Sequence, residues 1–190
     1  MTSEKEEPGA WGGIHICGRA HTNAEGGKGS SEIGGAVYGG NDDADNSGTL
    51  QYIRLEYTGF AFDEEHEANG ISFYGVGNGT IVDHCQAYKG SDDGFEFFGG
   101  SVNVSNLVAV SCSDDSFDWT EGWNGKGTNL VAYQEAESTL GYDCDCLMEC
   151  DNNGSNNAAT PVAHPVLKNL ILCLLYTSPT HETLRHLVCR

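Results

Sequence analysis

Apolar and polar residues alternate in several short runs along the chain. In residues 84–87 a cysteine and an alanine alternate with a histidine and a glutamine, and in residues 95–97 two phenylalanines flank Glu96. A period of two places alternate side chains on opposite faces of a β-strand. No helical stripe of useful length occurs before residue 172. The pattern predicts an all-β protein of short strands whose apolar positions face inward.

One of these runs belongs to an internal repeat. Residues 91–97 (Ser-Asp-Asp-Gly-Phe-Glu-Phe) recur as 113–119 (Ser-Asp-Asp-Ser-Phe-Asp-Trp) at an offset of 22, and residues 69–74 match 93–98 at an offset of 24. Short alternating strands repeating at this period, with glycine and asparagine at the corners, are typical of solenoid coils. Leucine-rich repeats share the period, but the chain lacks their regularly placed leucines. We therefore predict a right-handed parallel β-helix, a solenoid of pectate-lyase-like architecture.

The repeat also divides the chain. We expect an acidic, flexible start over residues 1–10 and a β-helix domain over 11–172. A solenoid needs capping coils to cover its end strands. Because neither end shows such a coil, we expect a β-helix that is incomplete at both ends, as in a fragment of a longer protein. The expected coils cover approximately residues 48–78, 79–100, 101–125 and 126–150.

The composition changes at Cys173. Residues 173–178 resemble the translation of a sequencing adapter, and a run containing histidine and arginine follows up to Arg190. A short amphipathic terminal helix is the alternative. We expect residues 173–190 to be a non-native tail and leave them out of the fold prediction.

Charge narrows the choice of partners. The chain has 28 acidic and 9 basic residues, a net charge of −19. Such a chain repels nucleic acid and anionic membranes, and no apolar stretch approaches the ~20 residues of a membrane span. We expect no nucleic-acid partner and no membrane insertion. Cations and hydroxyl-rich ligands fit this surface better.

The repeat should stack acidic residues on one another. Neighbouring coils lie about 4.8 Å apart, so residues 22 apart in sequence become neighbours, including Glu96 and Asp118. Clustered carboxylates suit calcium, although raised pKa values, screening by solvent, or capping of turns through backbone N–H groups are alternatives. The candidate calcium site consists of Asp92, Asp93, Asp114 and Asp115.

Carboxylates on adjacent coils could also act as general acid and base in glycoside hydrolysis. The Asp-Asp-Gly segment resembles part of the polygalacturonase motif set, but that family's Gly-His-Gly and Arg-Ile-Lys segments are absent from this sequence. A lyase would need a basic residue beside its calcium, and Arg54 is the only arginine between residues 20 and 184. We assign no catalytic residue and lean against an enzyme.

Aromatic residues near the acids could bind sugar. An outward aromatic side chain beside carboxylates can serve as a platform for a sugar ring. The partner would then be a polysaccharide or a host glycan. The candidate platform residues are Phe98, Trp123 and Tyr133.

Several segments together resemble a family of exported right-handed parallel β-helix proteins from Bacteroides-type bacteria, a family without an assigned reaction. The resemblance covers about residues 11–172 and implies a secreted or surface-anchored protein; the first seven residues lack the apolar core of an export signal. It is carried by residues 11–14, 38–41, 48–54, 75–80 and the two Ser-Asp-Asp coils.

Fold, charge and resemblance lead to one main hypothesis. We expect a non-catalytic secreted or cell-surface β-helix module that is stabilised by a cation and binds glycans. One alternative is a fragment of a polysaccharide hydrolase or lyase that uses paired aspartates. The other is a structural stalk or adhesin segment.

Overall fold

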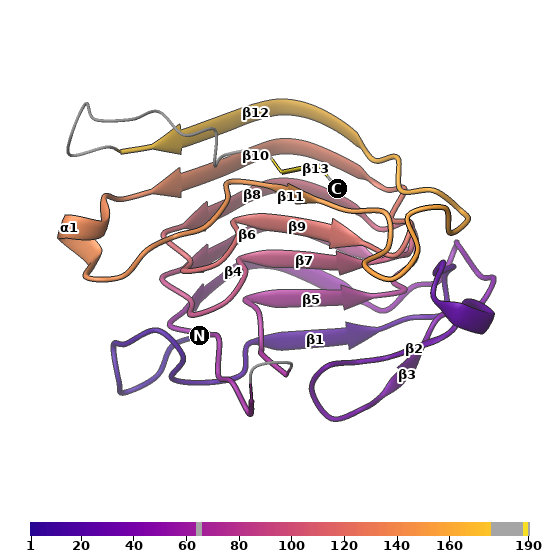
Figure 1. Cartoon of the computed structure of the whole chain (residues 1–190), viewed down its shortest axis with the longest axis horizontal. Helices are drawn as coiled ribbons and strands as arrows, with labels where there is room; N and C mark the ends of the chain where they lie inside the picture. Colours follow the sequence, from indigo (N-terminus) through magenta and orange to yellow (C-terminus); the bar gives the residue numbers. More distant parts are fainter. Residues whose placement is uncertain (64–65, 176–187, 190) are drawn as a thin grey trace.

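Two parallel β-sheets form the walls of a stack of coils in the computed structural model, which describes residues 1–63, 66–175 and 188–189 (Figure 1). The short-strand sheet consists, in spatial order, of β1 (Ile14–Cys17), β5 (Ile71–Tyr74), β7 (Phe95–Phe98), β9 (Phe117–Thr120), β11 (Glu149–Cys150) and β13 (Val188–Cys189). The long-strand sheet consists of β4 (Thr49–Glu56), β6 (Ile81–Tyr88), β8 (Asn103–Val110), β10 (Lys126–Gln134) and β12 (Val166–Leu174). This is the predicted right-handed parallel β-helix.

Elements outside the two sheets are few in the described part of the chain. A small antiparallel hairpin of β2 (Gly29–Ser30) and β3 (Val37–Tyr38) lies beside the first coils, and a 3-10 turn covers Glu25–Gly27. The only α-helix described, α1, spans Glu137–Leu140. No described helix has the length and apolar character needed to cross a membrane.

The coils stack in the register that the repeat predicts. Phe95 pairs with Phe117 at the offset of 22, and Ile71 pairs with Phe95 at the offset of 24. Inward side chains therefore lie above one another: the rings of Phe95 and Phe117 stack with centroids 5.4 Å apart. Such columns of buried aromatic and aliphatic side chains form one continuous core.

Residues with positive φ recur at three corners of the coils. Because L-residues rarely adopt this left-handed conformation, glycine and asparagine are favoured there. These residues have φ between 51° and 65°. They are Gly75, Gly99 and Glu121 at the first corner; Tyr52, His84, Asn106, Asn129 and Asn169 at the second; and Tyr57, Lys89 and Ser111 at the third.

The second corner bends the long strands and carries a ladder of amides. Asn129 Nδ2 donates a hydrogen bond of 2.8 Å to Asn106 Oδ1, and Asn169 Nδ2 donates one of 3.0 Å to Asn129 Oδ1. Asn106 Nδ2 in turn donates to Asp83 Oδ1. The side chains thus join four successive coils outside the core.

Both ends of the predicted β-helix domain adjoin ordered backbone. The amides of Gly9 and Ala10 donate hydrogen bonds to carbonyls just after β4, and the carbonyl of Met1 accepts one from Glu56. At the other end β12 pairs with β10 as far as Leu174, two residues past the expected boundary. Most of the expected tail, residues 176–187 and 190, lies outside the described residues.

Candidate cation-binding site

The outward face of the short-strand sheet carries a column of polar side chains. The strand register places His15 beside Ser72, Ser72 beside Glu96, Glu96 beside Asp118, and Asp118 beside Glu149. Neighbouring strands in a sheet are separated by about 4.8 Å. Three acidic side chains from successive coils are therefore direct neighbours on this face.

The bends that lead into β7 and β9 add the four aspartates predicted from the repeat. Asp93 Oδ1 accepts a hydrogen bond of 2.9 Å from the backbone N–H of Asp115, and Asp115 Oδ1 accepts one of 2.7 Å from the N–H of Cys146. One coil earlier, Asn69 Oδ1 accepts from the N–H of Asp93. Asp93 and Asp115 therefore each use one carboxylate oxygen to cap a turn. Turn capping is one of the alternatives that the sequence leaves open.

These side chains meet in a pocket of about 240 Å³. All of the residues that line it in the described part of the chain carry a carboxylate: Glu32, Glu67, Asp92, Asp93, Glu96, Asp114, Asp115, Asp118 and Glu149. Arg54 pairs with Glu56 and Lys89 with Glu135, both outside the pocket lining. The charge of this acidic pocket is therefore not balanced by a lysine, arginine or histidine in its lining.

Sequence reasoning found six of these nine acids and missed three. Glu149 lies one coil above Asp118 but follows a longer loop, so its offset breaks the period. Glu32 belongs to the β2–β3 hairpin, and Glu67 to the connection between β4 and β5. Neither connection repeats in sequence, so no periodic signal could have placed them.

Burial changes the ionisation of these acids. It raises the pKa of Asp92 and of Asp118 to about 7, with neighbouring carboxylates adding to the effect, and the pKa of Asp115 to about 9. Burial and then the charge of nearby acids hold the pKa of Asp93 and Glu96 well above the usual range. Near neutral pH several of these groups therefore either keep a proton or need a cation in its place.

The carboxylate oxygens are close enough to share an ion. Asp92, Asp93 and Asp114 form one group whose ligand atoms all lie within 4.8 Å of one another, and Asp93, Glu96 and Asp118 form a second. Calcium binds oxygen at about 2.3–2.6 Å, so its ligands lie at most about 5 Å apart. One oxygen of Asp118, Oδ1, is buried and has no hydrogen-bond partner among the described residues. Both groups fit a hard divalent cation, and Asp93 belongs to both.

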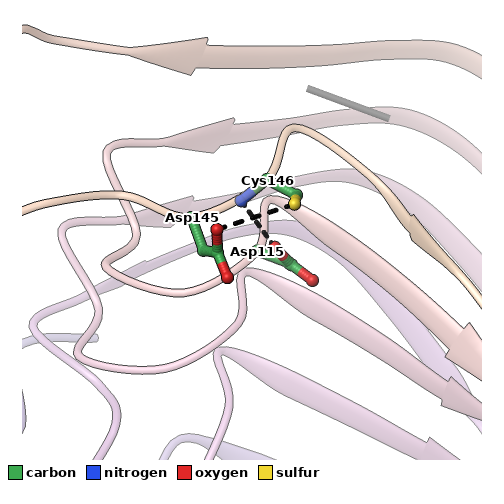
Figure 2. A group of neighbouring side chains, drawn as sticks. All are labelled: Asp115, Asp145 and Cys146. Carbon is green, nitrogen blue, oxygen red and sulfur yellow. Dashed lines mark hydrogen bonds between the residues drawn. The ribbon is translucent and has the colours of Figure 1, made fainter. Parts of the chain in front are cut away.

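A third group is less suited to calcium. Figure 2 shows Asp145 and Cys146, on the segment that leads into β11, next to Asp115. Cys146 Sγ lies 3.8 Å from Asp145 Oδ1. Burial raises the pKa of the Cys146 thiol to about 12, so the sulfur is protonated and a poor ligand for a hard cation.

The predicted aromatic platform is not formed. Trp123 is in the core, where its ring stacks on Phe97 at 4.1 Å and its indole N–H donates to the carbonyl of Val102. Phe98 points outward from β7, but Tyr38 and Tyr74 cover it, and only 8% of its surface is exposed.

The third platform residue, Tyr133, is half-buried in the long-strand sheet, where it pairs with Val110 and Cys173. The three aromatic residues thus belong to the core, the short-strand sheet and the long-strand sheet respectively. The prediction of a shared outward platform was wrong because the corner at Glu121 and Gly122 turns Trp123 inward.

Comparison with known proteins agrees with the architecture. A family model described as a pectate-lyase-like β-helix domain matches residues 1–186. No curated protein and no solved structure matches the chain. The match spans nearly the whole sequence, and the chain belongs to the family of pectate-lyase-like β-helix domains.

Proposed function

We propose that the protein is a non-catalytic, secreted or cell-surface β-helix module whose acidic pocket binds a divalent cation, calcium in particular. The observation that carries the proposal is the lining of the pocket, to which the described residues contribute nine carboxylates and no basic side chain. Folding brings these like charges together, a cost that the extended chain largely avoids. A cation that binds only the folded state offsets this cost and stabilises the protein by mass action.

The location and the partner of the module are part of the same proposal. Membership of a β-helix family supports a place outside the cell, and the net charge of −19 supports a partner that is not an anionic polymer. We propose a polysaccharide or host glycan as that partner. The cation then stiffens the face of the short-strand sheet on which the glycan is held.

A second candidate function rests on one pair of residues. Glu96 and Asp118 lie opposite each other on adjacent strands, and both have a pKa raised by burial and by neighbouring acids. A protonated carboxyl beside an ionised one can act as acid and base in glycoside hydrolysis. A lyase would also need a base, and no lysine or arginine lines the pocket in the described part of the chain.

Calcium should raise the melting temperature of the protein more than sodium chloride of equal ionic strength, because screening alone cannot replace ligands. Asp93→Asn should remove most of the calcium-specific increase. Asparagine keeps the Oδ1 that caps Asp115, so the calcium-free variant should be as stable as the unmodified protein. Thermal unfolding of both proteins in chelator, in calcium and in matched sodium chloride measures the calcium effect, its loss in the variant and the stability of the calcium-free variant.

Asp143→Asn is the matched control for this test. Asp143 is exposed and likewise accepts a backbone hydrogen bond, from Cys144, so its replacement should leave the calcium effect intact. Equal effects of calcium and sodium chloride would refute the cation site. Strong destabilisation of calcium-free Asp93→Asn would contradict the charge repulsion that the cation is proposed to offset, because asparagine keeps the cap on Asp115.

The calcium-free protein should lose stability as the pH rises. The pKa values of the pocket acids are raised on folding, so the folded state holds protons that the unfolded chain releases near pH 4. The stability that these bound protons give the folded state is complete below the unfolded pKa. It is lost as the pH rises through the folded pKa values of about 7 to 9. We expect the melting temperature in chelator to fall by about 10 °C between about pH 5 and 8, and saturating calcium to remove most of the fall. A melting temperature that rises over this range in chelator would contradict the raised pKa values.

Tests of catalysis should be negative. Incubation with polygalacturonan, alginate and host glycans should release neither reducing ends nor unsaturated products, because no described residue of the lining is a lysine or arginine that could serve as base for elimination and the acids are proposed to hold a cation. Reducing-sugar and ultraviolet absorbance assays measure the two products. Turnover that Glu96→Gln or Asp118→Asn abolishes would establish the hydrolase instead.

A further inference from the structure

We propose that Cys112 and Cys144 form a disulfide bond when the protein folds under oxidising conditions. Both thiols are free in the structure. Cys112 follows β8 and belongs to the core, whereas Cys144 lies on the connection between β10 and β11, which also contains α1. The bond goes beyond the proposed function, because it ties this connection to the preceding coil without using any oxygen of the acidic pocket.

Hydrogen bonds place the two cysteines on neighbouring stretches of backbone. The hydroxyl of Tyr142 donates to the carbonyl of Ser111 at 2.7 Å. Further along, the backbone N–H of Asp145 donates to the carbonyl of Asp114 at 3.2 Å. Both contacts join residues 31 positions apart in sequence, so the two segments run side by side in the same direction. On each segment the cysteine lies between these two contacts.

This arrangement brings the two cysteines within the reach of a disulfide bond. At the offset of 31, Cys144 lies opposite residue 113, so that the two cysteines are one residue out of step. Neighbouring extended segments lie about 4.8 Å apart and rise about 3.3 Å per residue, which predicts a separation of about 6 Å between the two Cα atoms. Disulfide bonds join residues whose Cα atoms are about 4.4–6.8 Å apart.

The electrostatics of the thiols agree with this placement. Burial and then the charge of Cys112 raise the pKa of the Cys144 thiol to about 12. Burial followed by the charges of Cys144 and Cys112 also raises the pKa of the Tyr142 hydroxyl. The two thiols and the hydroxyl therefore form one cluster at the corner that follows β8.

The connection between β10 and β11 is exposed and gains stability from a covalent tie. Most side chains from Glu137 to Asp145 are exposed. The helix α1 spans only Glu137–Leu140 and is too short to be stable by itself. A disulfide bond stabilises mainly by restricting the unfolded chain, and its effect grows with the length of chain that it closes. The bond between Cys112 and Cys144 closes a loop that contains all of β9 and β10.

The oxidant is an external disulfide such as oxidised glutathione. Cys144 is half-buried and Cys112 has no exposed surface, so Cys144 reacts first. Its thiolate attacks one sulfur of the oxidant, forms a mixed disulfide and releases one thiolate. The Cys112 thiolate then attacks the Cys144 sulfur and releases the second. Two protons pass to the solvent, and two electrons reduce the oxidant to two thiols.

The bond forms during folding, before the thiols are buried. Only a thiolate attacks a disulfide, and a thiol with a pKa of about 12 keeps its proton near neutral pH. In the unfolded chain a cysteine has a pKa of about 8.5 and exchanges readily. A secreted chain folds in an oxidising compartment, and only this condition depends on the location proposed above.

The test refolds the full chain with and without the oxidant. Reduced protein in guanidinium chloride is diluted at about pH 8.5 into reductant or into reduced and oxidised glutathione, and the remaining thiols are blocked with a maleimide. After trypsin digestion without reductant, mass spectrometry should find residues 90–126 joined to residues 127–168 through Cys112 and Cys144. The oxidised protein should melt about 5 °C or more above the reduced protein.

Two substitutions on the same segment form a matched pair. Cys144→Ser should lose both the cross-link to Cys112 and the difference in melting temperature, whereas Cys146→Ser should keep both. The inference is overturned if Cys112 carries the maleimide after oxidative refolding, if it is joined to a cysteine other than Cys144, or if oxidation does not raise the melting temperature. The peptide map of the unmodified protein decides even if a variant fails to fold. None of these results alters the calcium effect measured in reductant.

Discussion

Stacking of similar coils at the strand spacing is the constraint on which the rest of the structure depends. It gives the core its aromatic columns, such as Phe95 on Phe117, because each inward residue packs on its equivalent one coil away. The same spacing acts on the outward residues and brings Glu96 against Asp118. Two full charges about 5 Å apart repel by roughly 3 kcal/mol at an effective dielectric constant near 20. The same stacking therefore produces both the core and the acidic pocket. It stabilises the fold where apolar side chains pack inside, and it costs free energy where carboxylates meet outside.

The aspartates reconcile two roles that the sequence presented as alternatives. Asp93 and Asp115 each use Oδ1 to accept a backbone N–H from the following coil, which fixes the corner. Each side chain also lines the acidic pocket. Capping thus holds the carboxylates together in groups that could hold a metal ion. The proposed cation would relieve the repulsion that stacking creates, so that stability and the proposed binding would depend on the same side chains.

Much of the fold was predictable because alternation and a fixed offset both follow from strand geometry. The offset of 22 in the sequence predicts the pairing of Glu96 with Asp118 that the strand register shows. Prediction failed where the chain leaves this periodicity. Glu32 and Glu67 reach the pocket from connections that do not repeat, and parity could not be counted through the corner at Gly122, so Trp123 was placed outside rather than in the core.

Proton release on calcium binding is the most direct measure of the link between stacking and the cation. Calorimetric titration of calcium into chelator-treated protein near neutral pH, in two buffers with different ionisation enthalpies, separates the heat of binding from the heat of buffer protonation. If the pocket acids hold protons until a cation displaces them, the observed enthalpies should differ by the equivalent of about one proton or more per ion. Calcium binding with equal enthalpy in both buffers, or no binding, would contradict a pocket in which buried carboxyl groups exchange protons for a cation.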